Sequence, residues 1–146
     1  MFAVNVSLVL PRDALTVAVA RHLCDSAMGE LGVTRGCRSD IGVALTEACT
    51  NVIDHSSDDH PYEVKIILDE TRCAIRVIDP GSEADVALLL PKDIDLDAEA
   101  GRGIALMNAL VDKVSFTREA RDGMVVHLTK ELEFNEGDPA RAKLRT

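Results

Sequence analysis

The chain has 146 residues, a length typical of one domain that can bury a hydrophobic core of its own. Its net charge of -9 argues against non-specific binding to nucleic acid or to an anionic membrane, because both need basic patches. The four cysteines show no zinc-ligand spacing, and we interpret them as buried free thiols. Since no apolar run approaches the length of a membrane span and no signal-type leader is evident, we expect a cytoplasmic protein.

The first part of the chain predicts one strand and two helices. Residues 2–10 alternate between apolar and polar side chains, as in a strand with one buried face, and Pro11 ends the pattern. Apolar residues then recur at helical spacing over residues 12–29. After a connection over residues 33–38, a second helix is expected over residues 39–56, followed by a polar turn.

The middle of the chain predicts two strands and a long acidic segment. Residues 62–68 and 71–79 are rich in β-branched and other apolar residues and form a hairpin across a short polar break. Residues 82–100 are irregular and acidic, and Pro91 interrupts any helix there. Inside a small domain, such a segment is either disordered or a functional lid.

The last part of the chain predicts a helix, a second hairpin and a tail. The helix covers residues 104–111, and the hairpin strands cover residues 114–119 and 124–134. Residues 135–146 contain few apolar side chains, so we expect a flexible tail after a single domain over residues 1–134. This order of elements predicts an α+β two-layer sandwich, with a mostly antiparallel (mixed) sheet that carries its helices on one face.

Polar residues follow one edge of the helix predicted over residues 39–56. Glu47, Asn51 and His55 recur at four-residue intervals and border the apolar face of this helix. A carboxylate and a carboxamide one turn apart, at the rim of a core, can serve a metal, a water or a phosphate. The other interpretation of this stripe is an ordinary solvated helix edge.

Two later features give this stripe candidate partners. Asp79-Pro80-Gly81 follows a strand, where the carboxylate is either a turn former or an acceptor for an amino group such as that of adenine. Gly101-Arg102-Gly103 opens a helix, where backbone N–H groups and the arginine can approach phosphates; an ordinary glycine-rich turn is the alternative. The sequence contains neither a P-loop motif nor a G-x-S-x-G hydrolase motif.

The order of these motifs resembles that of a known superfamily. E-x-x-x-N on a helix, D-x-G after a strand and G-x-G at a helix start are typical of the GHKL ATPases, which include gyrase, the large heat-shock chaperone and histidine kinases. With "EACTNVIDH" and "GRGIALM" in one short domain, the chain is most similar to the anti-sigma factor serine/threonine kinases. The resemblance extends from Val4 to about Phe134 and implies the Bergerat-type ATP-binding fold.

The resemblance also implies a role for each matched residue. Glu47 would be the catalytic general base that activates a serine or threonine hydroxyl of a protein substrate. Asn51 would bind Mg²⁺, and Asp79 would accept the amino group of adenine. The residues implied in binding ATP and its Mg²⁺ are Asn51, Asp79, Gly81, Gly101, Arg102 and Gly103.

The function implied by the resemblance is that of an anti-sigma factor that phosphorylates an anti-anti-sigma antagonist and so regulates transcription by partner switching. A sigma factor, the antagonist and a second copy of the chain are the implied partners, with no direct binding of nucleic acid or membrane. Two positions depart from the family pattern: Glu83 replaces the second glycine of D-x-G-x-G, and Met124 follows Gly123 where a threonine is usual. The alternative is therefore a regulatory module that sequesters its partner and has weak or no nucleotide turnover. A detached histidine-kinase domain fits less well, because no dimerisation helices with a phospho-acceptor histidine accompany it.

Overall fold

The computed structural model describes residues 2–55, 60–80, 99–119 and 123–137. The segment predicted to be either disordered or a lid lies outside the described residues up to residue 98, and so does the tail from residue 138. The described elements are β1 (Ala3–Leu10), α1 (Ala14–Glu30), α2 (Arg35–His55), β2 (Tyr62–Asp69), β3 (Arg72–Asp79), α3 (Glu99–Leu110), β4 (Lys113–Glu119) and β5 (Gly123–Glu131).

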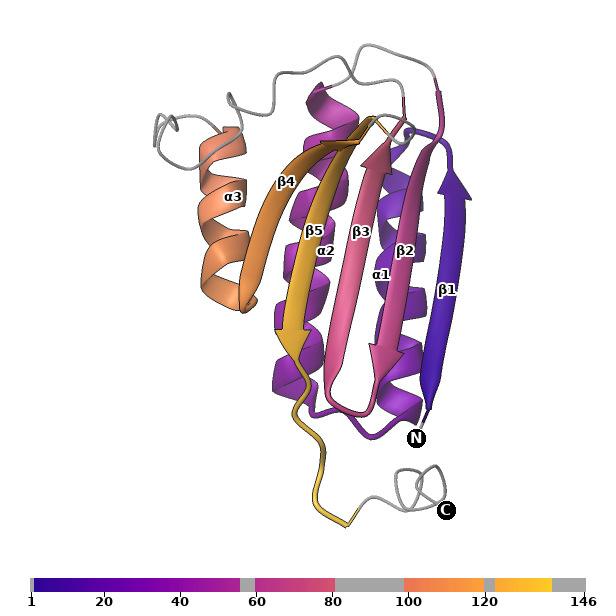
Figure 1. The fold of residues 1–146 in the computed structure, drawn as a ribbon, viewed down its shortest axis with the longest axis vertical. Coiled ribbons are helices and arrows are strands. Elements are labelled where there is room, and N and C mark those ends of the chain that lie inside the picture. Colours follow the sequence, from indigo (N-terminus) through magenta and orange to yellow (C-terminus); the bar gives the residue numbers. More distant parts are fainter. Residues whose placement is uncertain (1, 56–59, 81–98, 120–122, 138–146) are drawn as a thin grey trace.

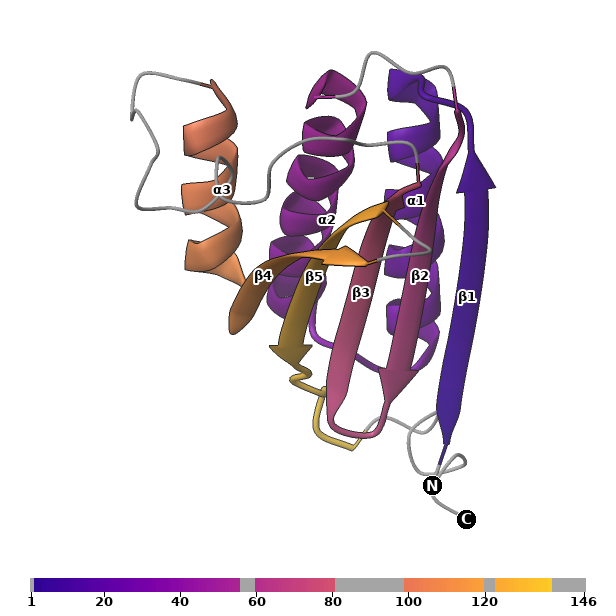
Figure 2. The same cartoon turned by 45° about the horizontal axis from the view of Figure 1, so that its top comes forward.

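The strands form a single sheet in the order β1-β2-β3-β5-β4, and every neighbouring pair is antiparallel. Helices α1 and α2 cover one face of this sheet, and α3 lies on the side of α2 that is away from α1 (Figures 1 and 2). The predicted α+β two-layer sandwich is confirmed, and the sheet in the described residues is antiparallel throughout. Among the helices that the structure describes, none has the length and apolar character needed to span a bilayer.

The hydrophobic core lies between the sheet and the two covering helices. Each helix buries one apolar face, as its residue spacing predicts: the buried side chains include Ala20, Cys24 and Met28 of α1, and Ile41, Leu45 and Ala48 of α2. All four cysteines are buried free thiols, as the sequence analysis predicted. Burial raises the pKa of Cys49 to about 12, so this thiol stays protonated at neutral pH.

Helix α2 begins earlier than predicted, at Arg35 and not near Ser39. Thr34 caps it, because its hydroxyl accepts a hydrogen bond from the Cys37 amide at 3.3 Å. The Thr34 amide in turn donates to the carbonyl of Glu133 at 2.8 Å. The connection predicted over residues 33–38 is therefore wrong from residue 35 onward, because a tertiary contact with the far end of the chain fixes the cap.

Two further boundaries differ from the prediction. Strand β5 ends at Glu131, before the predicted end at Phe134, because the chain then turns toward the α1–α2 connection, where Val33 and Phe134 form an isolated bridge. Helix α3 begins at Glu99 and includes Gly101-Arg102-Gly103, which were predicted to precede its first turn. The helix includes both glycines because its packing against α2 stabilises it.

Candidate functional site

The polar stripe of α2 lies at the edge of the core, as its spacing predicted. Glu47 and Asn51 are half-buried, whereas the neighbouring Ala48 and Val52 are fully buried. His55 is the last residue of the helix. Helix α3 packs against α2, and the Glu47 side chain of the stripe lies beside it. A stripe in this setting differs from an ordinary solvated edge.

Gly103 of α3 lies directly against the Glu47 side chain. A Cβ atom at position 103 would lie 2.7 Å from Glu47 Oε2, a distance that no real side chain tolerates without movement. Only glycine therefore allows the carboxylate to approach the backbone of α3 this closely. The structure thus brings together two residues from separate motifs, predicted as general base and phosphate-loop glycine.

The other two residues of the glycine motif have different positions on α3. Gly101 is buried and lies in the first turn of the helix, where backbone N–H groups have no intrahelical acceptor. Arg102 is exposed, so its guanidinium can reach solvent or a bound anion. This end of α3 therefore offers backbone donors, a positive partial charge and a cation, all of which favour phosphate.

Asp79 is the last residue of β3, and its side chain is only 2% exposed. The guanidinium of Arg12, itself 8% exposed, donates to Oδ1 of this carboxylate. Arg12 also donates to the carbonyl of Val52 at 2.9 Å and to that of His60 at 2.6 Å. One side chain thus neutralises the buried carboxylate and ties it to the last turn of α2, next to Asn51. Within the described residues, this carboxylate accepts no side-chain hydrogen bond besides that from Arg12.

Arg12 was not among the residues predicted for the site. It stands alone in the connection between β1 and α1, where an arginine belongs to no recognised motif. The signal that could have found it is the need of a buried carboxylate for a counter-charge. The sequence contains several arginines, and only the fold shows which one meets this need.

The start of β5 lies against the backbone of Asp79. Gly123 has a φ angle of 74°, and a Cβ atom there would lie 2.3 Å from the Asp79 carbonyl oxygen, so glycine is required on both counts. Met124 is opposite Asp79 in the sheet register and is buried. Met124, which replaces the usual threonine of the family pattern, is therefore next to the candidate adenine carboxylate. Gly81 and Glu83 lie outside the described residues.

These contacts suit ATP with Mg²⁺. Asp79 offers a buried carboxylate oxygen to an amino group, and the start of α3 offers donors to phosphates. The described residues contain no group of three or more histidine, cysteine, aspartate or glutamate side chains that could hold a metal by themselves. Mg²⁺ in nucleotide sites takes few protein ligands besides phosphates and water, so a magnesium–nucleotide site does not require such a group.

Comparison with known proteins defines the class. Residues 10–130 match the model of the histidine kinase-like ATPase domain, and the chain belongs to this family. The chain is 31% identical to the serine-protein kinase RsbW of Halalkalibacterium halodurans, over 92% of this chain and 87% of the relative. It is 28% identical to the serine-protein kinase RsbW of Bacillus thuringiensis, over 92% of each chain.

A solved structure supports the same fold. The crystal structure of the RsbU and RsbW domains of a Mycobacterium tuberculosis protein superposes with a TM-score of 0.67, at 20% sequence identity. The match covers 88% of this chain but only 32% of that larger chain. The predicted membership of the GHKL ATPases, with the related fold, is confirmed by these comparisons.

Proposed function

We propose that this protein is an anti-sigma factor that binds ATP-Mg²⁺ in the cytoplasm and phosphorylates a serine or threonine of an anti-anti-sigma antagonist. It would hold a sigma factor inactive and release it by partner switching, and it would act as a homodimer. The likeness to the RsbW kinases over 92% of the chain supports this proposal. The structural observation that carries it is the contact of the Glu47 carboxylate with the backbone of Gly103.

Glu47 is the proposed general base. In the transfer step, the substrate hydroxyl oxygen bonds to the γ-phosphorus, the bond to the ADP oxygen breaks, and Glu47 takes the hydroxyl proton. Its placement against Gly103, in the helix that offers donors to phosphates, supports a role close to the transferred group. Phosphoryl transfer depends mainly on positioning and charge neutralisation, so a carboxylate beside the phosphate-binding end of α3 suits this role.

The remaining residues are proposed to bind the nucleotide. Asn51 would hold Mg²⁺, which neutralises phosphate charge, and Gly101, Arg102 and Gly103 would contact the phosphates. Asp79 would accept the amino group of adenine, with Gly81 allowing the ring to approach the backbone. The ion pair with Arg12 supports this role for Asp79, because it stabilises the carboxylate in a buried position.

A second candidate function is a partner-sequestering module with weak or no nucleotide turnover. The observation that favours it is Met124, which is buried opposite Asp79 where the family usually has a threonine hydroxyl. A thioether is only a weak acceptor and cannot reproduce the hydrogen bonds of a hydroxyl.

Phosphotransfer to a cognate antagonist, measured with ATP and Mg²⁺, tests the proposal. Glu47→Gln should slow transfer by about 100-fold or more, because it removes the general base, while calorimetry still detects ATP binding. Glu133→Gln serves as the control, since it removes an exposed carboxylate outside the site. ATP binding without transfer by the unmodified protein would favour the second candidate, and absence of ATP binding would contradict the proposed kinase.

A further inference from the structure

Two hydroxyl groups determine the position of Arg12, the residue that pairs with Asp79. The arginine lies in the connection between β1 and α1, between Pro11 and Asp13. Thr16, in the first turn of α1, places its Oγ1 atom 2.8 Å from the Pro11 carbonyl oxygen and 2.7 Å from that of Asp13. One hydroxyl group therefore binds the backbone on both sides of Arg12.

The Thr16 hydroxyl is itself bound by Tyr62, the first residue of β2. Their oxygen atoms are 2.8 Å apart, and Tyr62 is completely buried. Thr16 has a single proton, which the two carbonyl groups of the connection accept, so the tyrosine hydroxyl donates and the threonine oxygen accepts. Burial raises the pKa of Tyr62 to about 12, so this donor keeps its proton at neutral pH.

Tyr62 also lies next to the segment that the Arg12 guanidinium binds. In the sheet it is the partner of Leu10, the last residue of β1, so it lies where the connection leaves the sheet. Two residues before it, the carbonyl of His60 accepts a hydrogen bond from Arg12 Nε at 2.6 Å. Tyr62 thus links the backbone that carries Arg12 to the segment that receives its side chain.

Stability alone does not explain this pair of hydroxyl groups. Replacing a buried hydrogen-bonded pair by apolar groups of the same shape is often nearly neutral for the free energy of unfolding. A hydrogen bond does, however, require a defined distance and direction, so the pair restricts where the connection can lie. The buried carboxylate of Asp79 needs its counter-charge at one position, and Arg12 supplies it.

We propose that Thr16 and Tyr62 are positioning residues that hold Arg12 against Asp79 and thereby set the preference of the site for a base with an amino group. The inference rests on the proposed function, in which Asp79 accepts the amino group of adenine. Without the hydroxyl pair the connection can shift, Arg12 neutralises the carboxylate less well, and the amino group loses an acceptor of fixed orientation.

The preference for ATP over inosine triphosphate, which has a carbonyl oxygen in place of the adenine amino group, tests the inference. Calorimetry with Mg²⁺ gives the Kd of each nucleotide, and the unmodified protein should prefer ATP. Tyr62→Phe and Thr16→Val should each reduce this preference by about 3- to 10-fold, the effect of one lost hydrogen bond, whereas Thr16→Ser should retain it. The kcat at saturating ATP should be unchanged, because neither variant alters Glu47.

Thr71→Val is the matched control. It also removes a hydroxyl group, one that binds Asp69 at 3.0 Å in the β2–β3 turn, at the end of β3 opposite to Asp79 (Figure 1). Its preference for ATP should stay within about twofold of the unmodified protein, as expected for a distant and independent position. Urea denaturation checks that each variant is folded.

The outcomes distinguish this inference from the proposed function. If folded Tyr62→Phe and Thr16→Val keep the full preference for ATP, the inference is overturned and the proposed function stands. An equal loss of affinity for both nucleotides would show a merely structural role and would also overturn it. Equal binding of ATP and inosine triphosphate by the unmodified protein would contradict the role proposed for Asp79, and the inference with it.

Discussion

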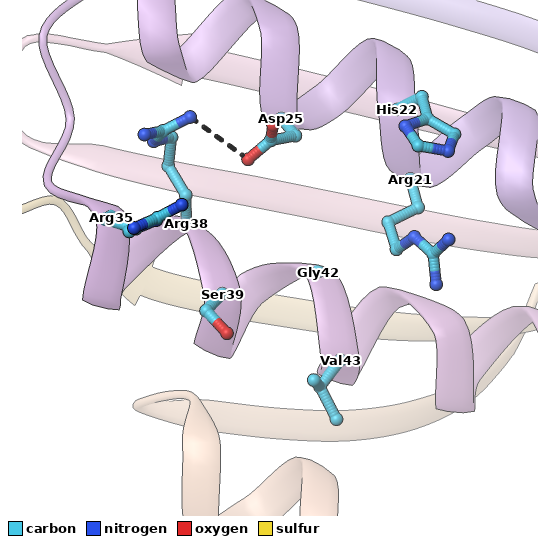
Figure 3. Close-up of a pocket in the computed structure, with 8 residues that line it drawn as sticks. All are labelled: Arg21, His22, Asp25, Arg35, Arg38, Ser39, Gly42 and Val43. Atoms are coloured by element: carbon cyan, nitrogen blue, oxygen red, sulfur yellow. Dashed lines mark hydrogen bonds and ion pairs between the residues drawn. The ribbon is translucent and has the colours of Figure 1, made fainter.

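The two halves of α2 hold their charged neighbours in opposite ways. Near the C-terminal half, the Arg12–Asp79 pair has side chains that are only 8% and 2% exposed. Near the N-terminal half, the Arg38–Asp25 pair is 26% and 49% exposed. The first pair stabilises a buried carboxylate, whereas the second pair (Figure 3) is open to solvent.

Near both halves of α2, a glycine lies close to a charged side chain of a neighbouring helix, but the space for a Cβ atom differs. At the candidate nucleotide site, a Cβ atom on Gly103 would be 2.7 Å from the Glu47 carboxylate. Between α1 and α2, Cβ atoms on Gly29 and Gly42 would be 3.1 and 3.5 Å from arginine side chains of the opposite helix. Alanine at position 103 would therefore require Glu47 to move, whereas alanine at position 42 would meet Arg21 at an ordinary contact distance.

The loss of stability in Arg12→Met, compared with that in Arg38→Met, should show the largest difference between the two halves of α2. It leaves the Asp79 carboxylate buried without its counter-charge, so the free energy of unfolding should fall by about 3–5 kcal/mol. Arg38→Met is the matched control and should cost less than about 1 kcal/mol, because its pair is exposed to water. Urea denaturation of both variants measures this difference, and equal losses would contradict the contrast between the two pairs.

The sequence predicted the order of the elements and the three motifs, because hydrophobic periodicity and local residue types determine them. It did not predict Arg12, since only the folded chain brings the β1–α1 connection to the end of β3. The start of α2 was missed for a similar reason, because Thr34 is fixed by Glu133 at the far end of the chain. The contact between Arg21 and Gly42 was missed as well, because these residues belong to different helices and their contact depends on how the helices pack.

Gly103→Ala, compared with Gly42→Ala, should distinguish a glycine that leaves no room for a Cβ atom from one that does. The new methyl group must displace the Glu47 carboxylate, and phosphotransfer should fall by about 10- to 100-fold, since small errors in position are costly in catalysis. Gly42→Ala is the control: its methyl group meets Arg21 at an ordinary contact distance, so transfer should be unchanged and the helix should gain about 1 kcal/mol. Kinetic assays with urea denaturation of both variants measure these effects, and an equal loss of transfer in the two would contradict the prediction.

A third carboxylate extends the comparison to the other end of β3. Asp69 precedes this strand, and its Oδ1 accepts hydrogen bonds from the amides of Thr71 and Arg72, both at 2.8 Å. The Thr71 and Arg72 amides, with the Thr71 hydroxyl, hold the pKa of the Asp69 carboxyl below its ordinary value of 3.8. Asp79 is held by a buried cation at one end of the strand, and Asp69 by backbone donors at the other.

Asp69→Asn should have the smallest effect and a specific dependence on pH. The amide oxygen of asparagine can still accept both backbone hydrogen bonds, so the hairpin should form and the loss at pH 7 should be below about 1 kcal/mol. Because the pKa of Asp69 is lower in the folded state, its charge stabilises the protein above 3.8, and this contribution is lost as the pH falls through the folded-state value. The difference in unfolding free energy between the unmodified protein and the variant should therefore be constant above about pH 5 and shrink toward zero as the pH falls below 3.8 and through the lower folded-state pKa. Urea denaturation across this range measures the difference. A constant difference would show that the hydrogen bonds of Asp69 stabilise the turn by their geometry alone, without a contribution from its charge.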